Sequence, residues 1–469
     1  MTLSRLRIVL QLGVLAGLWL LANGVRAAEA SPTHAGRFIA LGDVHFDPFA
    51  GFTRAQFAEL LNTPVEAWTN QFRIQPAPTF GADAPYSLIE SSLDDARARL
   101  PDPDWILVPG DFLAHGWPAK YDQLAPRTRT EDPATYRRFT HQVMQFLAGR
   151  LRARFPSTPI FSVLGNEDSD CGDYLLTPQS SFLRDCVDDW KSLVFPKGTE
   201  GREQRRFRET LARGGYYSVR LPQLRRHRLI ALNTVFFAPQ YSNACGDSTS
   251  TPARDQLHWL EAELQSAERA GETVWLLMHL PPGIDSYATL KAGGWPQPLW
   301  QPELTAWFLQ LLARHEKRIQ FGFAGHTHMD DFRLVHLGPR PVLVTKIVPG
   351  VSPIFGNNPG YHLVTYDRRS GRILDYQTAG YRLNGPEPRV WALEYTFSQA
   401  YPGSRLEPES LESLGRQVIP GTAVGAIYRQ WYSVAGQPTP IPVEALGCAF
   451  LSTTVGAYQV CAPALAPPP

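Results

Sequence analysis

Cysteine is scarce in this sequence of 469 residues. The five cysteines are Cys171, Cys186, Cys245, Cys448 and Cys461, and no two stand at the C-x-x-C spacing typical of thiolate metal sites. A metal site built from cysteines is therefore excluded. Cys448 and Cys461 are close in sequence, and we expect them to form a disulfide. Spacing does not fix the other connectivity, for which we expect Cys171 to pair with Cys245 and Cys186 to stay free.

The chain also lacks an excess of charge of either sign, with 45 basic and 44 acidic residues and a formal net charge of +1. Removal of residues 1–27 would take away three arginines, leaving 45 − 3 = 42 basic residues and a net charge of −2. A nucleic-acid-binding surface needs a strongly basic face, so none is expected. Lysine is rare, at 6 against 39 arginines, and alanine and proline are abundant. This bias suggests a bacterial genome rich in G and C.

Long apolar runs are absent except near the amino terminus, where Ile8 to Ala22 follow Arg5 and Arg7. The run has about fifteen residues, whereas a membrane-spanning helix needs about twenty. Small residues follow it in "NGVRAAEA". This order is typical of a secretory signal peptide, predicted as residues 1–27 with cleavage after Ala27. We expect an exported protein, periplasmic or secreted, with no transmembrane segment in the mature chain.

Short apolar runs alternate with amphipathic stretches, which predicts an α/β fold with buried, largely parallel strands. The predicted strands cover residues 37–42, 105–110, 159–165, 228–233, 273–279, 319–325 and 342–347. Helices are predicted over residues 87–100, 136–155, 253–270 and 303–318, the third beginning after a Thr251 cap and Pro252. Residues 389–418 also look helical. We therefore expect a catalytic domain at 36–384, a helical carboxy-terminal subdomain at 385–462 and a disordered proline-rich tail at 463–469.

Potential metal ligands stand at the ends of five predicted strands. They are Asp43 and His45 in "LGDVHFDP", Asp111 in "VPGDFLAH", Asn166 in "LGNED", His279 in "LMHLPPG", and His326 and His328 in "AGHTH". Singly, a Gly-Asp step is an ordinary turn and a lone histidine is more often a hydrogen-bonded core residue. Because sites in α/β sheets form where the carboxyl ends of strands converge, the five together predict one site.

Oxygen and imidazole ligands without thiolate suit two divalent metal ions, with zinc expected and manganese or iron as alternatives. Two such ions need a bridging carboxylate, for which Asp111 is the natural candidate. Asn166 can bind an ion without adding negative charge. A metal-bridging hydroxide would then attack phosphorus, and the predicted reaction is hydrolysis of a small phosphoester substrate.

These motifs, in this order, resemble the calcineurin-like metallophosphoesterase superfamily. The stretches "GDFLAH", "HLPPGID", "GNNPGYHLVTYD" and "WALEYTFSQAY" are similar to the acid sphingomyelinase-like phosphodiesterases within it. The resemblance implies a four-layer sandwich of two mixed β-sheets flanked by helices, with a helical carboxy-terminal region. It implies one metal held by Asp43, His45, Asp111 and His328, and a second held by Asp111, Asn166, His279 and His326.

Two departures from the family affect the expected function. The family's histidine after Gly-Asn, which acts as acid to the leaving group, is replaced by Glu167, and beside two cations this carboxyl group should stay ionised. The resemblance offers His115, four residues after Asp111, as the substitute acid; its ordinary alternative is a loop histidine bonded to the backbone. Glu167 would then contact substrate or orient the ligands. In addition, only about ten residues separate the predicted signal peptide from the first strand, too few for the saposin-like domain of lipid-active relatives, so we expect soluble substrates.

Other acidic residues near the motifs have structural explanations. Asp47 matches a family aspartate and is expected to form a turn, while Asp168, Asp170 and Asp173 are expected to be solvated or to orient metal-binding imidazoles. The predicted protein is thus an exported phosphodiesterase with two metal ions. The alternatives are a phosphomonoesterase or nucleotidase with the same centre, and a non-catalytic binding protein stabilised by metal.

Overall fold

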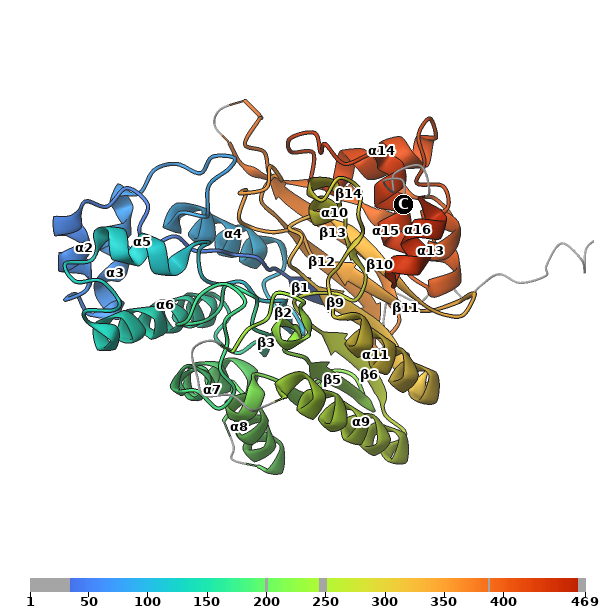
Figure 1. The fold of residues 1–469 in the computed structure, drawn as a ribbon, viewed down its shortest axis with the longest axis horizontal. Coiled ribbons are helices and arrows are strands. Elements are labelled where there is room, and N and C mark those ends of the chain that lie inside the picture. The colour runs from blue at the N-terminus through green and yellow to red at the C-terminus, as the bar shows by residue number, and fades with distance from the viewer. Residues whose placement is uncertain (1–33, 199–200, 244–250, 387–388, 463–469) are drawn as a thin grey trace, which may run out of the picture.

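The computed structural model describes residues 34–198, 201–243, 251–386 and 389–462. The predicted signal peptide, the predicted disordered tail and Cys245 lie outside these residues. Two six-stranded sheets form the centre, and helices surround them (Figure 1). The two-sheet sandwich flanked by helices that the resemblance implied is therefore confirmed.

The first sheet has the order β14-β13-β12-β1-β2-β3. Its strands are β1 (Ala35–Ala40), β2 (Ile106–Val108), β3 (Ile160–Ser162), β12 (Gly360–Asp367), β13 (Ile373–Tyr381) and β14 (Trp391–Thr396). Strands β1, β2 and β3 are parallel, whereas β12, β13 and β14 join them in antiparallel register. The sheet is therefore mixed, and predicted ligands follow the carboxyl ends of its three parallel strands.

The second sheet has the order β10-β11-β9-β6-β5-β4. Its strands are β4 (Tyr217–Arg220), β5 (His227–Ala231), β6 (Thr273–Leu277), β9 (Ile319–Ala324), β10 (Asp331–Leu337) and β11 (Arg340–Ile347), and a separate hairpin consists of β7 (Ile284–Asp285) and β8 (Gln297–Pro298). Strands β5, β6, β9 and β11 are parallel, and β4 and β10 pair in antiparallel register. All seven strands predicted from the sequence are confirmed.

In Figure 1 the first helices of the chain (blue and cyan) and those of the carboxy-terminal end (red) lie on opposite sides of the sheets, and the green and yellow helices lie between them along the lower edge. The earlier group is α2 (Arg54–Leu60), α3 (Trp68–Gln71), α4 (Tyr86–Arg99), α5 (Trp117–Leu124), α6 (Pro133–Arg154), α7 (Ser181–Val194) and α8 (Arg202–Gly214). The later group is α9 (Pro252–Ala270), α10 (Ser286–Lys291), α11 (Pro302–His315), α12 (Phe397–Ala400), α13 (Pro408–Gly415), α14 (Ala423–Tyr432), α15 (Val443–Leu451) and α16 (Val455–Cys461). Short 3₁₀ turns cover Val65–Ala67, Phe72–Ile74 and Thr234–Phe237. The four predicted helices correspond to α4, α6, α9 and α11.

An aromatic cluster joins the two sheets in the core. Phe38 of β1 packs on Trp105, with ring centroids 5.3 Å apart, and edge-on against Phe323 of β9 at 5.5 Å. Trp275 of β6 lies 5.8 Å from Phe38 and 6.1 Å from Tyr366 of β12. Such rings bury large apolar areas, so their packing holds the parallel strands of the two sheets against one another.

Residues 391–396, predicted as helix, form strand β14 instead, and that prediction was wrong. The strand pairs antiparallel with β13, so that Tyr381 lies opposite Trp391 and Thr378 opposite Tyr395. Both tryptophan and tyrosine favour strands when they can pack across a sheet, and the Trp391 ring contacts Tyr381 at 5.6 Å. The domain boundary predicted at residue 385 stays a prediction. It falls between β13 and β14, which are hydrogen-bonded to one another.

The predicted cap of α9 is correct in position but not in bonding. Thr251 is the residue before the helix and Pro252 its first residue, yet the Thr251 side chain makes no capping hydrogen bond.

No helix among the described residues combines the length and apolar character required to cross a bilayer.

The described residues confirm two of the predictions about the cysteines. Cys448 and Cys461 are bonded, which confirms that pair, and Cys186 is free and buried as expected. Cys171 is disulfide-bonded, and its expected partner Cys245 is outside the described part of the chain.

Candidate metal centre

All seven predicted ligands lie just beyond the carboxyl ends of parallel strands. Asp43 and His45 follow β1, Asp111 follows β2, Asn166 follows β3, His279 follows β6, and His326 and His328 follow β9. These strands belong to both sheets, whose ends meet at one place. The structure therefore brings together every residue of the predicted ligand set.

Asp111 lies at the centre of the cluster. Its Oδ2 is 3.2 Å from Nε2 of His45 and 3.1 Å from Nε2 of His279. The side-chain oxygen of Asn166 is 3.0 Å from Nε2 of His279 and 2.9 Å from Nδ1 of His326. Asp111 thus stands between a group around His45 and a group around His279, the position that a bridging ligand requires.

Two imidazoles in the first group face one another with their Nε2 atoms. His45 donates Nδ1–H to the carbonyl of Leu113 at 2.9 Å, and His328 donates Nδ1–H to the carbonyl of Ser352 at 3.1 Å. The remaining nitrogen of each ring is Nε2, and these two atoms are 3.0 Å apart, so that two unprotonated rings would direct their lone pairs at one another. Two lone pairs at this distance repel, whereas a cation between them would bind both.

The carboxylate of Asp43 supplies a second sign that the cluster fits a metal. Its Oδ1 accepts the backbone N–H of His326 at 2.7 Å, whereas its Oδ2 is buried and has no hydrogen-bond partner among the described residues. Burial raises the pKa of Asp43 to about 7. A divalent cation would favour the carboxylate and provide the missing partner for Oδ2.

His279 shows the same need for positive charge. Its Nδ1–H donates to the carbonyl of Pro109 at 2.7 Å, so Nε2 faces two oxygen acceptors, on Asp111 and Asn166. Burial lowers the pKa of His279, but Asp111 and Asp43 outweigh burial and raise it to about 9. A proton on Nε2 takes the place that a metal ion would fill.

Backbone conformation at the ligands is strained. Five of the seven have a positive φ: Asp43 at 47°, His45 at 39°, Asp111 at 56°, His326 at 76° and His328 at 61°. Each such non-glycine residue costs on the order of 1–3 kcal/mol and persists only where the surrounding structure enforces it. Five such residues in one cluster favour a functional role for this part of the fold.

Two glycines make room for the carboxylates. A Cβ on Gly165 would lie 2.0 Å from Oδ1 of Asp111, and a Cβ on Gly325 would lie 2.6 Å from Oδ2 of Asp43. Any side chain there would displace a ligand oxygen. This explains why Gly precedes Asn166 and His326 in the motifs.

The acidic residues after Asn166 orient amides rather than imidazoles. Asp168 is 1% exposed, and its carboxylate accepts four backbone N–H groups, from Asp111, Phe112, Leu113 and Gly165, at 2.7–3.1 Å. Asp173 accepts from the Asn166 amide at 2.9 Å, which leaves the amide oxygen toward His279. The expectation of a solvated loop was wrong for Asp168, because its carboxylate joins two ligand loops.

Glu167, the departure from the family, is also buried. It is 3% exposed, its N–H donates to Oδ1 of Asp111 at 3.0 Å, and its Oε2 has no partner among the described residues. Burial, with the nearby carboxylates of Asp173 and Asp111, raises the pKa of Glu167 to about 10. Bound cations would act in the opposite direction and favour the ionised form that the sequence predicts.

His115 lies beside the first group of ligands. Its ring stacks on His45 with centroids 4.0 Å apart, and its nearest ring nitrogen is within 4.8 Å of those of His45 and His328. Nδ1 is 2.8 Å from Asp83, which also accepts from Lys120 at 2.7 Å. Burial lowers the pKa of His115, but Asp83 outweighs it and raises the pKa above its usual value.

No sequence motif pointed to Asp83 or Lys120, which stand in "GADAPY" and "WPAKYD". Asp47 does form the expected turn, since its Oδ1 accepts the Phe49 N–H at 2.9 Å, and its Oδ2 also accepts from Lys120. Asp47, Asp83 and Lys120 come together only in the folded chain, where the loop before α4 contacts α5.

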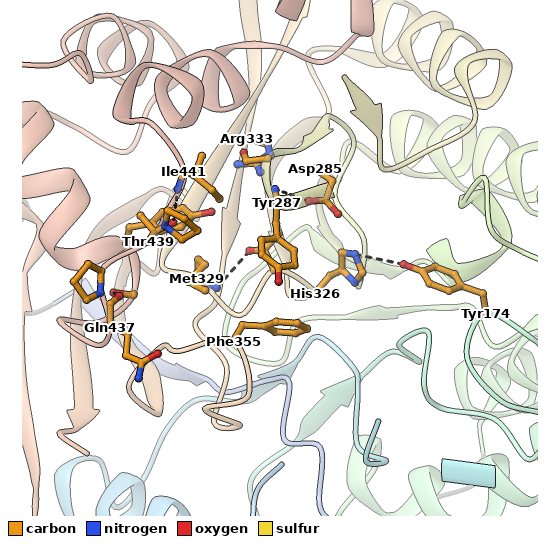
Figure 2. A pocket seen from close by; sticks show the side chains of 16 residues that line it. Tyr174, Asp285, Tyr287, His326, Met329, Arg333, Phe355, Gln437, Thr439 and Ile441 are labelled. Carbon is orange, nitrogen blue, oxygen red and sulfur yellow. Dashed lines mark hydrogen bonds between the residues drawn. The ribbon is translucent and has the colours of Figure 1, made fainter. Parts of the chain in front are cut away.

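A pocket of about 320 Å³ opens beside the metal ligands (Figure 2). His326 lines it together with Tyr174, Tyr287 and Phe355, while Ile441 and its neighbours in the carboxy-terminal region form the opposite wall. Tyr287 and Phe355 are 41% and 43% exposed. An aromatic pocket that shares a residue with a metal centre can hold the organic part of a substrate whose phosphate lies at the metals.

Phe355 connects this pocket to the histidines. Its ring packs edge-on against His328, with centroids 4.8 Å apart, and against His115 at 5.5 Å. The pocket therefore has an aromatic entrance that lies against the histidines.

Comparisons with known proteins agree with these features. Residues 36–330 match the family model described as calcineurin-like phosphoesterase. The chain is 27% identical to acid sphingomyelinase-like phosphodiesterase 3b of Mus musculus over 78% of this chain and 76% of that protein. It is 26% identical to cyclic GMP-AMP phosphodiesterase SMPDL3A of Homo sapiens over 82% of this chain and 80% of that protein.

Among solved structures, a dimetal phosphatase from Danio rerio aligns with a TM-score of 0.40 and 12% sequence identity. The alignment covers 76% of this chain and 98% of that one.

Proposed function

The chain belongs to the calcineurin-like phosphoesterase family, and on that premise we propose that it is an exported phosphodiesterase that works with two divalent metal ions. It is a hydrolase of phosphoric esters, similar over most of its length to acid sphingomyelinase-like phosphodiesterases. The number of metal ions, the preference for diesters and the export belong to the proposal.

The position of Asp111 carries the proposal of two ions. Its Oδ2 is within 3.2 Å of both His45 and His279, and these two histidines belong to separate groups of ligand atoms. We assign one ion to Asp43, His45, Asp111 and His328, and the other to Asp111, Asn166, His279 and His326. When bound, the ions would make a water molecule nucleophilic near neutral pH and neutralise charge on the phosphoryl group.

The direct test is turnover after metal reconstitution. Protein stripped with a chelator should hydrolyse bis(4-nitrophenyl) phosphate only after zinc or manganese is restored, with two metal ions bound per chain. A higher kcat/KM for 4-nitrophenyl phosphate would favour the alternative of a phosphomonoesterase or nucleotidase. Metal binding without turnover of either ester would favour a non-catalytic binding protein.

We assign the general acid to His115, because Asp83 holds Nδ1 and leaves Nε2 as the ring atom available to a substrate. A general acid contributes on the order of a hundredfold to ten-thousandfold, chiefly for poor leaving groups. His115→Ala should therefore slow an alkyl phosphodiester by such a factor and barely affect a nitrophenyl ester. Glu167→Gln should change both rates little, and a selective loss for the alkyl ester in that variant would move the acid to Glu167.

The pocket favours a diester that carries a planar heteroaromatic group. Tyr287 and Phe355 are exposed at the pocket and can pack against such a group. One of the relatives is named as a cyclic GMP-AMP phosphodiesterase, so we take a dinucleotide as the substrate class to test. A dinucleotide should be hydrolysed without detergent, and Phe355→Ala should raise its KM; an unchanged KM in that variant would contradict this substrate class.

Export is supported by the sequence of the first 27 residues, which lie outside the described part of the chain. The protein recovered from the periplasm or medium should begin at Ala28. An intact Met1 on the exported protein would contradict cleavage.

A further inference from the structure

Asp83 is the buried partner of His115. The side chain of Asp83 is 1% exposed, and its Oδ1 lies 2.8 Å from Nδ1 of His115. Its Oδ2 accepts the backbone N–H of His115 at 3.0 Å and a bond from Nζ of Lys120 at 2.7 Å. One carboxylate therefore holds both the backbone and the ring of this histidine, although 32 positions separate the two residues.

These contacts fix which atom of the ring faces the site. A carboxylate can only accept from Nδ1–H, so the proton on Nδ1 is held by Asp83 and the chemistry of the ring is left to Nε2. The ring is also fixed in its plane by stacking on His45, with centroids 4.0 Å apart and an angle of 22° between them. On the side of the pocket, the ring of Phe355 packs edge-on against His115, with centroids 5.5 Å apart.

We propose that Asp83 is a positioning residue for the leaving-group step, which it serves by holding His115 with Nε2 toward the substrate. This inference rests on the proposed function. In the step, the bond from phosphorus to the leaving oxygen breaks with its electron pair on oxygen, and that oxygen takes the proton of Nε2. Water supplies the hydroxyl that replaces it on phosphorus, and the second proton of that water passes to solvent, from which Nε2 is protonated again.

The chain offers a matched control in Asp47. Asp47 and Asp83 both accept from Nζ of Lys120 at 2.7 Å, but Asp47 Oδ1 accepts the backbone N–H of Phe49, in its own turn, rather than that of His115. Asp47→Asn therefore removes a charge next to Lys120, as Asp83→Asn does, without touching His115. A merely electrostatic or structural role of this cluster would make the two variants behave alike.

The experiment compares an alkyl phosphodiester with bis(4-nitrophenyl) phosphate in the full chain reconstituted with zinc. Asp83→Asn should lower kcat for the alkyl ester about tenfold to a hundredfold, as loss of an orienting partner does, and leave the nitrophenyl ester within about twofold. Asp47→Asn should leave the ratio of the two rates at its wild-type value. Normal turnover of the nitrophenyl ester also serves as the check that Asp83→Asn folds and keeps its metals.

A double variant separates action through His115 from independent effects. If Asp83 acts through His115, then Asp83→Asn combined with His115→Ala should be no slower on the alkyl ester than His115→Ala alone. Three results would each overturn the inference. The first is a double variant whose rate loss is the product of the two single losses; the second is an equal loss on both esters in Asp83→Asn; the third is loss of bound metal from Asp83→Asn. Failure of the wild type to hydrolyse either ester would instead refute the proposed function, so the two failures are distinguishable.

Discussion

Glu167 should make the stability of the chelated protein depend on pH. The pKa of its carboxyl group is raised from 4.5 to about 10 in the folded chain. Between these values the folded state keeps a proton that the unfolded state has released, so the free energy of unfolding falls as pH rises. The slope is about 1.4 kcal/mol per pH unit, which amounts to about 2.7 kcal/mol between pH 6.5 and 8.5.

Other buried groups also titrate in this window, so the effect of Glu167 is measured as a difference between wild type and Glu167→Gln. Burial lowers the pKa of His326 and His362 to about 3, so in the folded chain both are neutral throughout the window, whereas in the unfolded chain they lose a proton near pH 6.5. This loss stabilises the folded state as pH rises, and it is the same in wild type and Glu167→Gln. Asp43 and His279 have raised pKa values of about 7 and 9 and also destabilise the chelated protein as pH rises. Their contribution is shared by wild type and Glu167→Gln, and it cancels when the two slopes are compared.

The assay is urea unfolding of wild type and Glu167→Gln at pH 6.5, 7.5 and 8.5 in excess chelator. The wild type should lose about 2.7 kcal/mol more than the variant across the window. For a chain of this size the unfolding entropy is about 0.9 kcal/mol/K, so thermal scans should show about 3 °C of additional loss. In zinc-loaded protein the difference should vanish, because the cations favour the ionised carboxyl group.

Two results would refute this reasoning. Parallel curves in chelator would mean that Glu167 is already ionised in the folded protein and is not desolvated as its burial indicates. A slope difference that persists in zinc would mean that the bound ions do not reach Glu167. The first result rejects the buried state of the carboxyl group and the second rejects its place beside the metals.

Further variants test the ligands and the carboxy-terminal region. Asp111→Asn should abolish hydrolysis and reduce bound metal, since two cations without a bridging charge repel, whereas Asp170→Asn should keep both; two tightly held metals with normal turnover in Asp111→Asn would remove Asp111 from the bridge. Gly165→Ala should lose metal because its Cβ would lie 2.0 Å from the Asp111 carboxylate, while Gly149→Ala, in open space, should retain it, as metal analysis would show. Replacing Cys448 and Cys461 by alanine should cost about 3 kcal/mol in urea unfolding, and an unchanged midpoint would show that their disulfide does not stabilise the fold.

Local pattern was sufficient to predict most of the fold and the cluster of candidate ligands. Each predicted strand is a short apolar run, and each candidate ligand follows a Gly or a strand end within a few residues. Every motif is therefore contained in one short stretch of sequence and can be recognised there. Parallel strands then bring such ends together without further information, because their carboxyl ends share one edge of a sheet. The clustering of the seven candidate ligands from Asp43 to His328 could be predicted for this reason.

Tertiary structure decided what depends on partners distant in sequence. Residues 391–396 became a strand because β13 offered an open edge, a contact that local helical pattern cannot reveal. Asp168 was found to hold the Asp111 loop rather than to lie in solvent, and Asp83 to hold His115, only where separate loops meet. Hydrogen bonds and packing act over a few ångströms in space, so residues outside a local motif acquire their roles only when the folded chain brings their partners within that range.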